Sequence, residues 1–178
     1  MQKLNAKELR TTDPSAKQIQ TIKKQPIYIV VDNVLDTYNV GSIFRLADAT
    51  AVQKVFLCGE TLKPPNPRIN KASIDTWKWV EWEYSETAVS AILNLKSKIL
   101  NLKVVAVEQD EKSVRFDQVR YELPLAIVVG NETYGVSKDV LDMADAIVEL
   151  PMRGVNKSLN VMVSCGIVLY EIMSQLII

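Results

Sequence analysis

The stretch LAIVVGNETYGVSKD, residues 125–139, places a continuously apolar segment directly before a glycine turn and the start of a helix. Its first five residues are short, apolar and rich in β-branched side chains, which is typical of a strand that is covered on both faces. Gly130 allows the backbone to turn or to approach a ligand closely. A buried strand, a turn and a helix in this order indicate an α/β domain.

The same alternation runs along the rest of the chain. Further short apolar strands are predicted at 27–31, 55–58, 104–107 and 146–150. Helices are predicted at 40–51, 86–99, 137–144 and from residue 159 onward. Residues 77–84 alternate large and charged side chains, which indicates a strand with one exposed face at an edge. We therefore predict an α/β fold with a mostly parallel sheet and helices on both faces.

Length and composition limit the classes of protein to consider. A chain of 178 residues with 48% hydrophobic residues is long enough for one domain with a core that needs no metal or disulfide. Histidine is absent, which excludes every histidine-based triad and any histidine general base. Cys58 and Cys165 lie in apolar runs, which suits buried, reduced thiols in a cytoplasmic protein. No ligand spacing indicates a metal site.

Neither end of the chain indicates a membrane protein. The first residues lack the apolar core of a signal peptide. The C-terminal run is nearly long enough to span a bilayer, but Glu171 and Gln175 interrupt it. A buried helix and a protein without a membrane partner are the prediction.

Basic residues are unevenly distributed, although the formal net charge is zero. Residues 1–24 carry six basic residues against two acidic ones, and residues 61–71 add Lys63, Arg68 and Lys71 with no acid. Such segments bind phosphates or are simply solvated, and charge alone favours the second interpretation. We predict a basic, helical N-terminal extension over 1–25, followed by one domain over 26–178.

Polar side chains follow three of the predicted strands. They are Asn39 and Arg45, then Glu132, then Ser158 and Asn160. Because the carboxyl ends of parallel strands meet at one edge, where open α/β sheets bind ligands, these residues are expected to form a site. The chain has neither G-x-G-x-x-G nor a P-loop, so nothing supports a dinucleotide or nucleoside triphosphate site.

Each of these residues also has an ordinary structural explanation. Arg45 is placed to pair with Asp48, and Glu132 is in a position common in a strand–helix turn. Ser158 suits the N-cap of a helix that begins at Leu159. That cap does not explain Asn160, which is unfavourable inside an apolar helix unless it meets a polar partner.

Three motifs in order resemble one known family. N-x-G-x-I-x-R at 39–45, G-N-E-x-x-G at 130–135, and P-M-x-G followed by S-L-N-V within 151–161 resemble the signature motifs of the SpoU (TrmH-type) family of SPOUT methyltransferases. The resemblance covers about residues 26–178. It implies S-adenosyl-L-methionine-dependent methylation of a ribose 2′-hydroxyl in RNA, with tRNA favoured over rRNA and no DNA. It also implies a deep C-terminal trefoil knot, an exception to the rule against knots, and a homodimer.

The resemblance assigns roles to individual residues. It implies that Asn39 and Arg45 contact the ribose and phosphate of the target, and that the catalytic group is completed by Glu132, Ser158 and Asn160. The implied cofactor-binding residues are Val107, Gly130, Leu150, Ser158 and Leu159. RNA contacts are expected from Arg45, Lys63, Arg68 and Lys71. Arg45 serves either as general base or, since a guanidinium normally stays protonated, as a group that stabilises phosphate and alkoxide.

Two departures and two alternatives accompany this assignment. Tyr38 replaces the usual proline before Asn39, and Tyr134 lies inside the second motif; neither change removes a functional group. One alternative is a catalytically silent RNA-binding protein of the same fold, which the intact polar residues disfavour. The other is a small-molecule enzyme that binds a phosphate ester, with a metal at Glu132 and Asp139.

Overall fold

The computed structural model describes residues 13–176. Of the expected basic extension over 1–25, residues 1–12 therefore lie outside the described residues. A short helix, α1 (Ala16–Thr21), follows them. Ser15 caps it, because its hydroxyl accepts a hydrogen bond from the Gln18 amide while the Gln18 side chain accepts one from the Ser15 amide.

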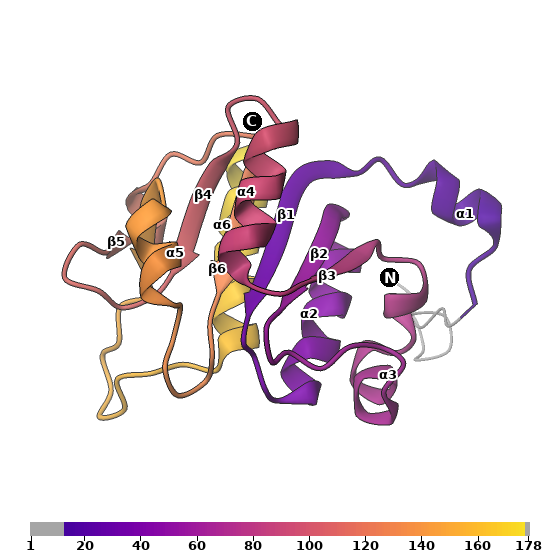
Figure 1. The fold of residues 1–178 in the computed structure, drawn as a ribbon, viewed down its shortest axis with the longest axis horizontal. Helices are drawn as coiled ribbons and strands as arrows, with labels where there is room; N and C mark the ends of the chain where they lie inside the picture. The colour runs from indigo at the N-terminus through magenta and orange to yellow at the C-terminus, as the bar shows by residue number, and fades with distance from the viewer. Residues whose placement is uncertain (1–12, 177–178) are drawn as a thin grey trace, which may run out of the picture.

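The described residues form one sheet of seven strands in the order β3-β2-β1-β6-β4-β7-β5. The strands are β1 (Gln25–Asp32), β2 (Val52–Cys58), β3 (Trp82–Ser85), β4 (Lys103–Val107), β5 (Val114–Arg115), β6 (Leu125–Val129) and β7 (Ala146–Glu149). Every pairing between neighbours is parallel. All strands therefore end at the same edge of the sheet, which is the lower edge in Figure 1.

Helices cover both faces of this sheet (Figure 1). They are α2 (Thr37–Ala49), α3 (Pro67–Ser73), α4 (Ala88–Lys98), α5 (Lys138–Met143) and α6 (Val161–Leu176), with short 3₁₀ turns η1 (Thr76–Lys78) and η2 (Phe116–Gln118). One face packs against α2 and α6, and the opposite face packs against α4 and α5. The predicted α/β fold with a parallel sheet and helices on both faces is confirmed.

The alternation of side chains along β1 explains why its segment 27–31 is apolar throughout. Ile27, Ile29 and Val31 belong to the core on the α2 and α6 face, and Val30 belongs to the core on the α4 face. All four side chains are fully buried. A strand with two covered faces has no exposed position at which a polar residue is favoured.

The segment 77–84 differs from the prediction. The edge strand β3 begins only at Trp82, because Trp77 and Trp79 lie in and beside η1 and pack against the α2 side of the core. The indole nitrogen of Trp79 donates a hydrogen bond to Asp48 on α2 at 2.7 Å. The alternation of large residues thus reflects a turn packed against a helix over its first half, and an edge strand over its second.

Two further predictions concern the cysteines and the apolar C-terminal segment. Cys58 and Cys165 are free and buried, as predicted, and burial raises the pKa of each thiol to about 12. Across residues 13–176, every helix falls short of the length and apolarity that a bilayer span requires.

Candidate active site

Three residues from three loops form a hydrogen-bonded chain at the carboxyl edge of the sheet. Asn39 lies in the first turn of α2, Glu132 follows β6, and Asn160 precedes α6. The Asn39 side-chain amide donates to Glu132 Oε1 at 2.9 Å, and the Asn160 amide donates to Asn39 Oδ1 at 3.0 Å. Asn39 is buried, so its two bonds satisfy a polar group that would otherwise be costly to bury.

Glu132 accepts further hydrogen bonds from the backbone. The amide groups of Leu35 and Asp36 each donate to its carboxylate at 3.0 Å. Withdrawal of the carboxyl group from solvent by itself raises its pKa, but the hydrogen bonds from Asn39 and from backbone amides outweigh this and hold the pKa of Glu132 below its ordinary value. Glu132 is therefore ionised at neutral pH and joins the β1–α2 loop to the β6–α5 loop.

The residue that caps α6 is Asn160, and the prediction that Ser158 caps a helix from Leu159 was wrong. The helix begins at Val161, and Asn160 Oδ1 accepts from the amides of Met162 and Val163 at 2.9 and 3.3 Å. The oxygen of Asn160 thus caps the helix while its nitrogen binds Asn39. Asn39 is therefore the polar partner that Asn160 was expected to need.

A cavity of about 460 Å³ lies beside this chain of hydrogen bonds. It is lined by the loops that follow β4, β6 and β7. All residues expected to bind a cofactor line it, namely Val107, Gly130, Leu150, Ser158 and Leu159. Glu132 and Asn160 line it as well, so the cavity adjoins the polar chain directly.

Carboxylates predominate among the charged groups of the cavity wall. Glu108, Glu132 and Glu149 line it, together with one ammonium group, that of Lys157. A wall with this charge favours a ligand that carries net positive charge. Among residues 13–176 no three histidine, cysteine or acidic residues are grouped closely enough to hold a metal ion.

Gly130 is required by the loop that follows it. A Cβ at this position would lie 2.2 Å from the Gly135 carbonyl carbon and 2.2 Å from the Val136 nitrogen. The loop folds back because Asn131 and Gly135 exchange backbone hydrogen bonds of 3.0 and 2.9 Å. The glycine was expected to allow close approach of a ligand, and the structure shows close approach of this backbone.

Glu108 and Gln109 are site residues that sequence reasoning missed. Glu108 Oε2 accepts from the Val136 amide at 2.8 Å, which fixes the β6–α5 loop. The Gln109 side chain donates to the Lys157 carbonyl, which fixes the β7–α6 loop. Neither residue belongs to a motif, and the available signal was their position directly after the predicted strand 104–107.

The similarity to known proteins extends over the fold and the site. Residues 26–170 match the model of the SpoU rRNA Methylase family. The chain belongs to this family. A tRNA (guanosine(18)-2′-O)-methyltransferase of Aquifex aeolicus is 32% identical over 160 residues, which cover 89% of this chain and 74% of that protein. The corresponding enzyme of Thermus thermophilus is 29% identical over 92% of this chain and 84% of its own length.

Solved structures of RNA-modifying enzymes have the same fold. The A. aeolicus TrmH/SpoU tRNA modifying enzyme superposes with a TM-score of 0.78 at 32% identity, over 89% of this chain and 82% of that one. An AdoMet-bound rRNA methyltransferase from Sinorhizobium meliloti also gives 0.78, at 26% identity, over 87% of this chain and 58% of that one.

The first SpoU motif runs from Asn39 to Arg45, and its two ends have different surroundings. Asn39 is bonded to Glu132 and Asn160, which line the first cavity, whereas Arg45 does not line that cavity. Arg45 is exposed on α2 and lines a second hollow of about 450 Å³, together with Gln18 of the α1 region and Trp79. The structure therefore does not bring Arg45 together with Glu132, Ser158 and Asn160. Within the described part of the chain Arg45 forms no ion pair with Asp48, whose carboxylate accepts from Trp79.

The basic residues expected at the RNA lie near the start of α2. Lys63, Arg68 and Lys71 are all exposed, the last two on α3. This helix packs closely on α2 because Gly41, the glycine of the first motif, lacks a side chain: a Cβ there would lie 2.6 Å from Ala72 Cβ. The glycine of the first SpoU motif thus sets the position of a basic helix.

Proposed function

We propose that this protein transfers a methyl group from S-adenosyl-L-methionine to a ribose 2′-hydroxyl of tRNA. Its family supports this, as do the two relatives named as tRNA 2′-O-methyltransferases and the AdoMet-bound structure of an rRNA methyltransferase. The observation that carries the proposal is the hydrogen-bonded chain of Asn160, Asn39 and Glu132, since it joins the three SpoU motifs beside one cavity.

The cavity suits this cofactor in size and charge. A volume of about 460 Å³ is within the range of small-molecule sites. The acidic wall of Glu108, Glu132 and Glu149 favours a cationic ligand, and Val107, Gly130, Leu150, Ser158 and Leu159 would hold it. When bound, the cofactor would supply an electrophilic methyl group. The ribose oxygen would form the new carbon–oxygen bond as the carbon–sulfur bond breaks, the thioether S-adenosyl-L-homocysteine would leave, and the hydroxyl proton would pass to water.

The polar chain positions the ribose. Asn39 cannot reorient, because its oxygen and its nitrogen are both engaged by Asn160 and Glu132. Ser158 is exposed and lines the cavity beside Asn160. We assign Asn39, Glu132, Ser158 and Asn160 to orientation of the target ribose against the cofactor.

For Arg45 we assign contact with a phosphate of the RNA. The rise along α2 from Asn39 to Arg45 is about 9 Å, since the two are six residues apart. The exposed guanidinium faces its own hollow, and it normally remains protonated. These facts favour contact with a phosphate flanking the target nucleotide over removal of the ribose proton.

The test measures transfer of a labelled methyl group to unmodified tRNA, with rRNA in parallel and mass spectrometry of the product nucleosides. Guanosine 18 is the first nucleotide to examine. Asn39→Ala is expected to lower kcat by about 10²-fold. Arg45→Ala is expected to reduce turnover below about a tenth while cofactor affinity by calorimetry is unchanged.

Asn94→Ala on α4, on the opposite face of the sheet, is the matched control and should retain full activity. Methylation of a base instead of a ribose would contradict the proposed reaction. Cofactor binding without any methyl transfer would favour the silent RNA-binding protein.

We further propose the assembly that the family resemblance implies. The segment from β7 to the end of α6 is proposed to form a trefoil knot within the domain 26–178. Its support is that α6 returns from β7 across β4 and β6 to pack against α2. The test is to pull the chain apart at residues 24 and 176 and to measure its fully extended length. A knotted chain extends to a shorter length than an unknotted one.

A homodimer through α6 and a role of the extension 1–25 at the RNA complete the proposal. The stripe formed by Val163, Ile167 and Tyr170 is apolar and exposed along one face of α6. A second copy of the chain would cover it.

The basic extension 1–25 is proposed to contact the RNA. Deletion of residues 1–12 should therefore weaken tRNA binding and leave cofactor affinity unchanged.

A further inference from the structure

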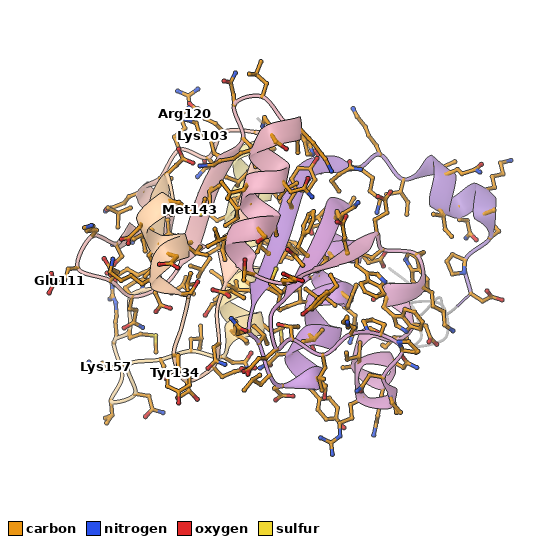
Figure 2. The ribbon with its side chains drawn as sticks, in the orientation of Figure 1. Lys103, Glu111, Arg120, Tyr134, Met143 and Lys157 are labelled. Atoms are coloured by element: carbon orange, nitrogen blue, oxygen red, sulfur yellow. The ribbon has the colours of Figure 1, made fainter. Side chains whose placement is uncertain are left out.

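Exposed aromatic side chains gather at the carboxyl edge of the sheet. Tyr84 at the end of β3 is 40% exposed, Tyr38 at the start of α2 is 46% exposed, and Tyr134 after β6 is 87% exposed. The strands concerned are β3, β1 and β6, which lie within one run of the sheet, β3-β2-β1-β6. Figure 2 shows Tyr134 at the lower edge, at the end opposite to Lys103, where β4 begins.

The start of α2, which carries Tyr38, and the loop that carries Tyr134 are ordered by hydrogen bonds and joined to each other. The amides of Thr133 and Tyr134 both donate to Asn131 Oδ1, at 2.8 and 3.0 Å. The Tyr38 amide donates to Asp36 Oδ1 at 2.8 Å. The Glu132 carboxylate binds the Asp36 amide and so connects the two loops. Ordered loops reduce the entropy cost of presenting these rings to a ligand.

Positive charge accompanies the aromatic rings. The Lys63 ammonium lies 3.9 Å from the centre of the Tyr84 ring, and Arg68 and Lys71 extend from the adjacent α3. Aromatic rings beside basic groups are the combination that binds single-stranded nucleic acid, because bases stack on the rings while the cations contact phosphates. A duplex keeps its bases stacked on one another, and it offers only its backbone and groove edges to such a surface.

We propose that this edge of the sheet binds RNA as an unpaired strand, with Tyr38 and Tyr134 stacking on its bases and Lys63, held over the Tyr84 ring, contacting a phosphate. The surface leads from β3 to the cavity beside Glu132, where the target nucleotide lies. The proposal rests on the proposed function and adds the form in which the RNA is bound.

The experiment measures binding of the full chain to a fluorescent 12-nucleotide unpaired RNA and to the same sequence in a duplex, by anisotropy at several salt concentrations. Tyr134→Ala and Tyr38→Ala are each expected to weaken binding of the single strand by about tenfold or more and to change duplex binding little. Their salt dependence should equal that of the parent, whereas Lys63→Ala should lower the slope by about one.

Two variants serve as controls. Tyr134→Phe retains the ring and should retain affinity. Leu100→Ala removes a side chain that is 84% exposed, after α4 at the amino edge of the sheet, and should have no effect. Calorimetric cofactor affinity equal to that of the parent shows that each variant is folded.

Equal losses for single strand and duplex, or losses no larger than that of Leu100→Ala, would overturn the proposal. Methyl transfer by the parent protein in the same preparation would then leave the proposed function standing. Absence of methyl transfer by the parent would be the separate failure of the proposed function.

Discussion

Asn39 shows why an amide and no other group suits its position. Its oxygen accepts from Asn160 and its nitrogen donates to Glu132, so the site needs one acceptor and one donor on the same planar group. An aspartate here would place a second carboxylate against Glu132. An alanine would leave two polar partners without their bonds.

The depressed pKa of Glu132 predicts a change in acid sensitivity. Since its pKa is lower in the folded chain than in the unfolded one, the ionised carboxylate stabilises the folded state above the unfolded value of about 4.3. This contribution is lost as the pH falls through the lower, folded pKa. In urea unfolding at pH 7, 5 and 3, Glu132→Gln should lose less stability between pH 5 and 3 than the parent. Glu122→Gln, at an exposed site, should follow the parent.

Parallel pH curves for the parent and Glu132→Gln would show that the hydrogen bonds to this carboxylate do not favour its ionised form.

At the scale of elements, the loops of the site depend on one another for their shape. The segment between β7 and α6 has no helix or strand from residue 150 to 160, yet it lines the cavity. Gln109 holds it at the Lys157 carbonyl, and the Asn160 side chain holds its end against Asn39. The cavity wall is thus built by contacts between loops and depends on the β4 loop as much as on its own sequence.

Two glycines in these loops predict opposite results. Gly130→Ala should destabilise the protein by about 1–3 kcal/mol, because its Cβ would overlap backbone atoms of Gly135 and Val136. The same change should weaken cofactor binding at least about tenfold. A tenfold loss of affinity corresponds to only about 1.4 kcal/mol of binding free energy. Gly154→Ala should change neither quantity, because no atom lies within 4 Å of the added carbon. Urea unfolding and cofactor calorimetry measure both effects.

Equal behaviour of the two alanine variants would mean that the β6–α5 loop relaxes freely, and that its close backbone contact does not shape the cavity.

The whole molecule has an apolar helix with only one side covered. Cys165, Val168, Leu169 and Ile172 of α6 are fully buried against the sheet. Val163, Ile167 and Tyr170 form the opposite, exposed stripe. The solvent-facing side of a helix is normally polar, whereas this side of α6 is apolar. That difference is the physical basis for the proposed dimer.

Ile167→Lys is expected to dissociate the proposed dimer, because it places a charge in the centre of this stripe. Sedimentation equilibrium at micromolar concentration measures the mass. Leu93→Lys, at an exposed leucine of α4, is the matched control and should leave the mass unchanged. A monomeric mass for a fully active parent protein would contradict the dimer.

The amino-acid sequence alone predicts the class of fold and the positions of the main strands. An uninterrupted apolar run such as Leu125–Val129 indicates a strand that is covered on both faces, and this pattern can be recognised in the local sequence. It also placed the polar residues after the strands, and so at one edge of a parallel sheet. The amino-acid sequence therefore predicts both the polar residues of the site and their motifs.

Which of those residues contact one another depends on the packing of the whole chain. The strand order brings Asn39, Glu132 and Asn160 together although 93 and 121 positions separate Asn39 from its two partners. In the folded chain Asn160, and not Ser158, caps α6, and Arg45 lines a separate hollow. These outcomes depend on which loops lie side by side and on the direction a side chain takes from its helix. Neither is encoded in local pattern, because both follow from packing between segments that are remote in the chain.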